Sequence, residues 1–134
     1  MQGEPFIDTN VLVYFTGDGK KSSVAEALIN EGGTISVQGL NELTLVLRRK
    51  HGYSWPDIRE VLSFLRSLLA IKALTIETHE IALSLAERYR LGFYDSLLLA
   101  AALQAGCDTF WSEDMQDGFV VEGTLTVRNP FLPS

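Results

Sequence analysis

Short, mostly apolar runs of three or four residues alternate along the chain with longer segments in which apolar residues recur every three or four positions. The short runs are typical of buried strands, and the longer segments are typical of helices with one buried face. The runs predict strands over residues 5–7, 34–37, 73–76, 109–111 and 125–127. The periodic segments predict helices over residues 22–30, 39–50, 54–69, 78–90 and 94–105. Strands that alternate with helices favour an α/β fold with a central, mainly parallel sheet of about five strands.

Local signals set the ends of several predicted elements. Residues 8–10 form a polar turn between the first strand and a second apolar segment, residues 11–15. Thr78 is the expected N-cap of a helix whose end is marked by Gly92. Residues 97–103 are apolar on almost every side of the last predicted helix, so we expect that helix to be buried.

The bulk composition describes one ordinary globular domain, which we expect to span residues 1–134. The chain is 46% hydrophobic and 21% charged, with a formal net charge of −6. This charge argues against a broad basic surface for nucleic acid, so any contact with a polyanion has to be local. The basic clusters available for such contact are Lys20 with Lys21, residues 48–50, and Arg88 with Arg90.

The single cysteine and the first residues of the chain favour a reducing cytoplasm. Cys107 cannot form an internal disulfide, and it lies in an apolar stretch where a thiol packs as a small hydrophobe. Residues 1–5 lack the basic region of a signal peptide, and the apolar run 97–103 is too short to span a bilayer. We therefore expect a cytoplasmic protein with no membrane segment.

Four acidic residues fall where an α/β sheet places its ligand-binding groups. Asp8 and Asp114 follow predicted strands, whereas Glu42 and Asp95 fall in the first turns of predicted helices. Strand ends and the helix turns that follow them meet at one edge of such a sheet, so we expect the four carboxylates to line one cleft. Packing gives no reason for an acid between two apolar segments, as at Asp8. Each of the other three also fits an ordinary role in a helix or turn.

Carboxylates in one cleft repel one another, so keeping all of them ionised requires a bound cation. Oxygen ligands favour Mg²⁺ or Mn²⁺, and the isolated His51 and His79 do not form a zinc-binding set with Cys107. One or two such ions activate water and neutralise the charge that builds on a phosphodiester during displacement. The natural reaction of this site is therefore phosphodiester hydrolysis.

Neighbours of the four acids are candidates for supporting roles. Asn10 and Ser112 are expected to donate hydrogen bonds to the carboxylates or to a phosphate. Asp117 is a candidate fifth ligand, and Glu113 is interpreted as a solvated acid.

The motifs, taken in order, resemble the PIN domain family, and within it the VapC-like toxins of bacterial and archaeal toxin–antitoxin pairs. The resemblance covers nearly the whole chain and rests on four parts of it. These are Phe6-Ile7-Asp8-Thr9-Asn10-Val11-Leu12, Asn41-Glu42-Leu43, Tyr94-Asp95-Ser96-Leu97-Leu98 with Ala105-Gly106-Cys107, and Ser112-Glu113-Asp114-Met115-Gln116-Asp117-Gly118. The first and last are the most specific. Ser96 departs from the family pattern, in which alanine is more usual, and the change is too mild to affect the site.

The resemblance implies a three-layer α/β/α fold and a Mg²⁺- or Mn²⁺-dependent endoribonuclease that cuts structured or messenger RNA. Such enzymes are often homodimers and are silenced by a cognate antitoxin protein that occupies the active-site groove. Asp8, Glu42, Asp95 and Asp114 match the family's four acidic positions, with Asp8 and Asp95 as the main metal ligands. Residues 39–70 match the family's helical clip, on which an antitoxin segment docks.

Two alternatives of other classes fit the residues less well. A phosphate-signalling receiver domain expects paired acids at the first strand and a late lysine, but the chain has a single acid at Asp8 and no lysine after Lys72. A haloacid-dehalogenase-like phosphatase expects a second aspartate where Asn10 stands. A third alternative keeps the PIN fold as a non-catalytic binding module, which the presence of all four acids disfavours.

Overall fold

The computed structural model describes residues 4–133, which form six helices and six strands. In chain order they are β1 (Phe6–Ile7), α1 (Thr9–Phe15), α2 (Lys20–Asn30), β2 (Thr34–Ser36), α3 (Val37–Arg49), α4 (Trp55–Leu68), β3 (Ala70–Lys72), α5 (Ile76–Tyr89), α6 (Phe93–Gln104), β4 (Thr109–Trp111), β5 (Val120–Val121) and β6 (Leu125–Arg128). None of these helices is both long enough and apolar enough to cross a membrane.

The strands form one sheet with the order β3-β2-β1-β4-β6-β5. All neighbouring strands are parallel except β5 and β6, which are antiparallel. β1 lies between β2 and β4, and the backbone N–H of Asp8 extends this pairing by donating to the Trp111 carbonyl at 2.9 Å. The ends of β1 and β4 therefore lie side by side.

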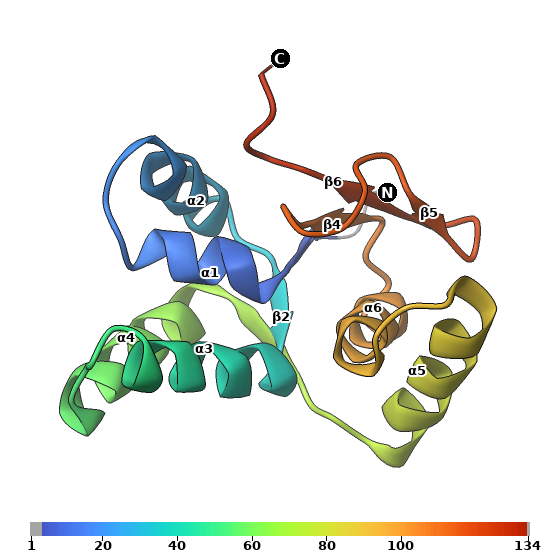
Figure 1. Ribbon diagram of the computed structural model, residues 1–134, viewed down its shortest axis with the longest axis horizontal. Helices are drawn as coiled ribbons and strands as arrows, with labels where there is room; N and C mark the ends of the chain where they lie inside the picture. Colours follow the sequence, from blue (N-terminus) through green and yellow to red (C-terminus); the bar gives the residue numbers. More distant parts are fainter. Residues whose placement is uncertain (1–3, 134) are drawn as a thin grey trace.

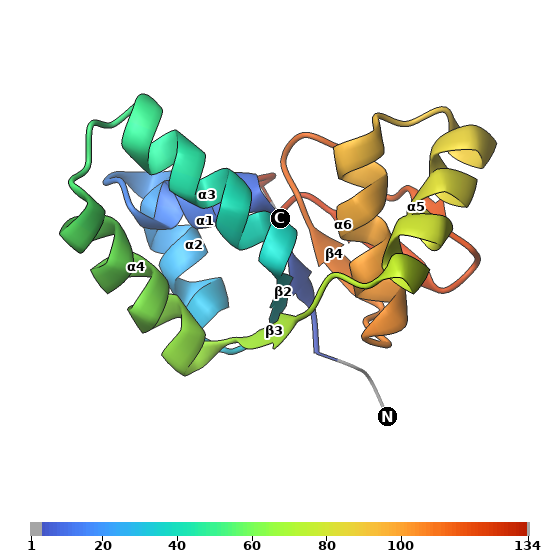
Figure 2. The same cartoon turned by 90° about the horizontal axis from the view of Figure 1, so that it is seen from below.

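Two groups of helices cover the sheet, with α1 to α4 on one side and α5 and α6 on the other (Figure 1 and Figure 2). Successive residues of β1 explain this division, because neighbouring side chains on a strand point to opposite faces. Phe6 packs in the cluster formed with α5 and α6, and Ile7 packs in the cluster formed with α1 to α4. The predicted three-layer α/β/α fold is confirmed.

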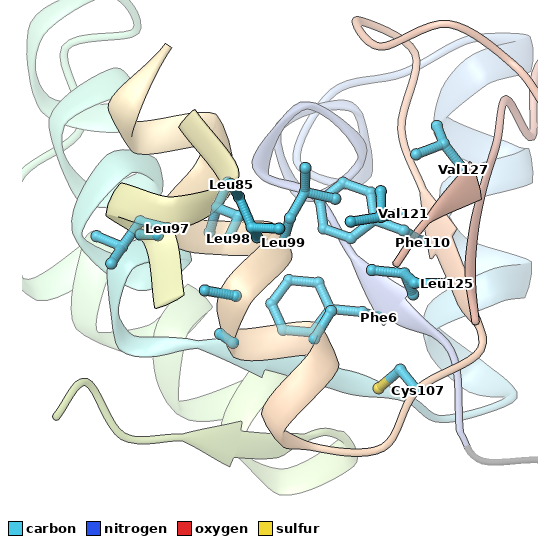
Figure 3. Close-up of a cluster of buried hydrophobic side chains, with 14 residues drawn as sticks. Phe6, Leu85, Leu97, Leu98, Leu99, Cys107, Phe110, Val121, Leu125 and Val127 are labelled. Carbon is cyan, nitrogen blue, oxygen red and sulfur yellow. The ribbon is translucent and has the colours of Figure 1, made fainter. Parts of the chain in front are cut away.

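The cluster around α6 joins the sheet to α5 and α6 (Figure 3). The rings of Phe6 and Phe110 stack with their centroids 5.3 Å apart. Residues 96–102 of α6 are all buried, which confirms the expectation of a buried helix. The first turn of this helix, which carries Asp95, directly precedes the buried segment.

The prediction of a strand over residues 73–76 is wrong. The third strand is β3, which pairs with β2 from Ala70 to Lys72. The hydroxyl of Thr75 instead accepts from the backbone N–H of Thr78, so Thr75 is the N-cap of α5 and Thr78 completes a capping box. Ile76 in the first turn is 75% exposed, which explains why its hydrophobicity was misleading.

Other elements also differ from the predictions. Residues 11–15 belong to helix α1, whose N-cap is Asp8. Helix α5 ends at Tyr89 with Arg90 in the left-handed conformation at φ 56°, and Gly92 is the N-cap of α6 rather than the end of α5. The sheet also has a sixth strand, β5, which was not predicted because two residues carry no measurable periodicity.

Candidate active site

A pocket of about 690 Å³ opens at the edge of the sheet where β1 and β4 end. Asp8, Glu42, Asp95 and Asp114 all line it, so the structure brings the four predicted acids together. They come from four separate parts of the fold: the end of β1, helix α3, the first turn of α6 and the turn after β4. Glu42 lies in the second turn of α3 rather than the first, because this helix begins at Val37 with Ser36 as its N-cap.

Asp8 is the most buried of the four, with 4% of its surface exposed. Its Oδ1 accepts from the backbone N–H of Thr9, the first residue of α1, at 2.7 Å. Its Oδ2 accepts from the Ser112 hydroxyl at 2.7 Å and from Asn10 Nδ2 at 3.0 Å.

The electrostatic surroundings of Asp8 disfavour its charged form. Burial raises the pKa of Asp8 to about 7, with smaller contributions from the charges of Asp95 and Glu42. The hydrogen bonds from Ser112 and Thr9 act in the opposite direction but do not offset burial. A cation in the pocket would reverse this balance.

Glu42 is held by two side chains on the same side of the sheet. Its Oε1 accepts from the Thr9 hydroxyl at 2.7 Å, and its Oε2 accepts from Gln38 Nε2 at 3.2 Å. Thr9 thus connects two acids, because its backbone N–H binds Asp8 and its hydroxyl binds Glu42.

Asp95 and Asp114 lie on the open side of the pocket, where both residues are exposed. Partial loss of solvent around the Asp95 carboxylate raises its pKa, and the charges of Glu42 and Asp114 raise it further. Ser96, the departure from the family pattern, donates its hydroxyl to the Gly92 carbonyl at 2.9 Å and so stays within its own helix.

Asn10 and Ser112 join the two strand-end acids. Asn10 Nδ2 lies 3.0 Å from Asp8 Oδ2 and 3.2 Å from Asp114 Oδ2. The Ser112 hydroxyl donates to Asp8 and accepts from the backbone N–H of Asp114 at 3.2 Å. Asp117 does not line this pocket, and its Oδ1 accepts from the backbone N–H of Asn129 at 2.8 Å.

The interpretation of Glu113 as a solvated acid is wrong. Its carboxylate accepts from the Tyr14 hydroxyl at 2.6 Å and forms a salt bridge with Lys21, and both contacts lower the pKa of Glu113. Its backbone N–H donates to Asn10 Oδ1 at 3.1 Å. These contacts fasten the turn that carries Asp114 to α1 and α2. A helix prediction over residues 9–15 would have placed Tyr14 and Asn10 on one face.

The donor chemistry of the pocket fits a hard divalent cation. Five carboxylates line it, and the four that are not paired with Lys21 supply oxygen ligands. Burial first and neighbouring charges second raise the pKa values of Asp8 and Asp95, which a cation would counter. As the side chains stand in residues 4–133, no group of three or more His, Cys, Asp or Glu residues could hold one ion. Binding would therefore require the carboxylates to turn toward a shared point and give up some of their present hydrogen bonds.

Comparison with known families identifies a family for most of the chain. The model of the family described as PIN domain matches residues 6–117. Comparison with curated protein sequences finds no match.

Several solved structures share the fold of the chain. A toxin–antitoxin complex from Klebsiella pneumoniae has a TM-score of 0.72 at 20% identity, covering 95% of this chain and 98% of that chain. VapC20 from Mycobacterium tuberculosis, a sarcin–ricin loop cleaving toxin, has a TM-score of 0.68 at 18% identity, covering 82% and 91%. VapBC2 from Rickettsia felis, bound to a DNA fragment from its promoter, has a TM-score of 0.68 at 18% identity, covering 93% and 97%.

Proposed function

The chain belongs to the PIN domain family, and from that premise we propose that it is a metal-dependent endoribonuclease that hydrolyses RNA phosphodiester bonds. The observation that carries the proposal is the pocket in which Asp8, Glu42, Asp95 and Asp114 converge from four separate elements. Folding alone gives no reason to gather four acids in one pocket at the expense of raised pKa values. Binding of cations and of a phosphodiester gives such a reason.

In this proposal Asp8 and Asp95 are the main ligands of Mg²⁺ or Mn²⁺, and Glu42 and Asp114 complete the set. The metal, when bound, supplies activation of water and neutralisation of charge on the phosphodiester. Asn10 and Ser112 fix the orientation of the Asp8 carboxylate through the hydrogen bonds at 3.0 and 2.7 Å. These contacts support a positioning role, because groups that orient metal ligands tune both affinity and activity.

The similar structures support a proposal about the protein partners of this chain. Two of those structures are complexes of toxin–antitoxin systems, and the third is a toxin that cleaves the sarcin–ricin loop. We propose that this chain is also a toxin silenced by an antitoxin, and that it is a cytoplasmic homodimer. The antitoxin would dock on the clip at residues 39–70, where the side chains of Leu45 and Phe64 are about half exposed.

The test is cleavage of a mixed RNA substrate by purified protein with Mg²⁺ or Mn²⁺. Asp8→Asn keeps the size of the side chain and removes its charge, so it is expected to reduce cleavage by more than about 100-fold, the upper range for groups that only orient a ligand. Asp117→Asn is the matched control, because it makes the same change outside the pocket. Its cleavage rate should equal that of the wild type.

Chelation of the metal with EDTA should stop cleavage by the wild type and by Asp117→Asn. Equal cleavage by wild type and Asp8→Asn would contradict the mechanism. Binding of RNA by the wild type without any cleavage would favour the non-catalytic binding module instead.

A further inference from the structure

One stripe of helix α3 runs along the pocket from its acidic end to a basic end. Glu42, Leu45 and Val46 of the helix line the pocket, and so do its C-cap, Lys50, and the next residue, His51. Their spacing of three, four and eight residues from Glu42 places them on one face of a helix. The pocket wall is therefore acidic at Glu42, apolar at Leu45 and Val46, and basic at Lys50.

Lys50 is free to bind an anion in this position. In the described part of the chain neither of the two salt bridges involves it. Its neighbours differ: Arg48 donates to the Tyr53 carbonyl at 3.0 Å and lies 4.7 Å from the centre of the Trp55 ring, and Arg49 does not line the pocket. Among the three consecutive basic residues at this helix end, Lys50 is the one that faces the acidic site.

A cation at a helix C-terminus has an ordinary explanation, because it interacts favourably with the helix dipole. That explanation applies equally to Arg48 and Arg49 and does not require a residue that lines the pocket. Charge complementarity supplies the further reason. A chain with a net charge of −6 needs a local cation to hold a polyanion near its four carboxylates.

We propose that Lys50 binds a backbone phosphate of single-stranded RNA whose scissile phosphate lies at the acidic end of the pocket. The inference rests on the proposed function and extends it to the path of the substrate. The eight residues from Glu42 to Lys50 span about 12 Å of helix, which corresponds to roughly three nucleotides of a stacked strand. Leu45, 48% exposed, and Val46 lie between the two ends and offer apolar contact to the intervening bases.

The first experiment measures binding without cleavage. Fluorescently labelled single-stranded RNA of mixed sequence is titrated with the Asp8→Asn protein and with the same protein carrying Lys50→Ala. Loss of one phosphate contact is expected to weaken binding about fivefold at an ionic strength of about 0.1 M, and to reduce the slope of log K against log salt by about 0.7. Arg66→Ala is the matched control, because this exposed residue lies in the last turn of α4 outside the pocket. Its salt slope should match that of the parent.

The second experiment locates the contact along the RNA. Single phosphates of an oligonucleotide that the wild type cleaves are replaced, one at a time, by neutral methylphosphonates. Roughly three nucleotides from the cut, one replacement should weaken binding by the parent about fivefold and leave binding by the Lys50→Ala protein unchanged. At all other linkages the two proteins should lose affinity equally.

An unchanged salt slope in the Lys50→Ala protein, or equal losses at every linkage, would overturn the inference. If the Lys50 contact is ruled out in this way but the wild type still cleaves RNA, the proposed function stands without that contact. A wild type that neither binds nor cleaves RNA would overturn both.

Discussion

Asp8 is 4% exposed and lies near the charges of Asp95 and Glu42, so its ionised form is unfavourable in the metal-free protein. Burial raises its pKa from 3.8 to about 7 on folding. Between these two values the folded state holds a proton that the unfolded state has released. Stability therefore falls as pH rises through this interval and levels off above about pH 7.

Asp8→Asn should remove this dependence, because an amide does not titrate. In EDTA, the free energy of unfolding of the variant relative to the wild type is expected to rise from about pH 4 to about pH 7, by on the order of 4 kcal/mol at most. Urea denaturation of both proteins across this range measures the difference. A difference that does not change with pH would contradict the assignment of the raised pKa to Asp8.

Single residues of the site were predictable to different degrees. An acid placed directly after an apolar run singles out Asp8, because charged side chains are almost never fully buried unless they are paired. The partners of Glu42 were not predictable, since Thr9 lies 33 positions away in the sequence and its hydroxyl contact at 2.7 Å depends on how α1 packs against α3. Lys50 was recognised only as part of a basic cluster, because the pocket that it lines forms by tertiary packing.

At the scale of secondary structure, the hydrophobic pattern predicted the bounds of an element correctly where burial alone decides them. The strand over residues 109–111 has the predicted bounds, and the buried helix α6 differs from its predicted range by one residue at each end. The hydrophobic pattern gave wrong predictions where a polar side chain decides where a helix begins. Asp8 begins α1 by capping it, and Thr75 turns part of an apolar run into the first turn of α5.

Thr75→Ala tests the capping box of α5. The substitution removes the hydroxyl that accepts from the Thr78 N–H, and it is expected to lower the free energy of unfolding by about 1 kcal/mol. Thr75→Ser is the control, because it keeps the hydroxyl and should retain most of the stability. The midpoint of urea denaturation reports the effect, and an equal loss in both variants would show that the Thr75 methyl group, rather than the cap, stabilises the helix. Neither change should alter cleavage, since α5 does not line the pocket.

At the scale of the whole molecule, the acids of the pocket come from both helical layers and from the sheet between them. Asp8 and Glu42 belong to the layer of α1 and α3, Asp95 belongs to α6 in the other layer, and Asp114 follows the central strand β4. Without a cation, charges from both layers repel across the pocket. With one, the same charges are drawn to a common point, so metal binding should stabilise the entire fold and not only the site.

Thermal unfolding with and without Mn²⁺ tests this coupling separately from catalysis. A ligand that binds only the folded state adds about 2.7 kcal/mol of stability when its free concentration is one hundred times its Kd. The wild type and Asp117→Asn should therefore gain melting temperature as Mn²⁺ rises, whereas Asp8→Asn should gain much less despite its higher stability in EDTA. A smaller gain in melting temperature for Asp8→Asn alone is specific to a cation site built on Asp8. General screening of a net charge of −6 would stabilise all three proteins alike. Parallel gains in the three proteins would mean that Mn²⁺ acts through the surface as a whole, and that the four acids do not form its binding site.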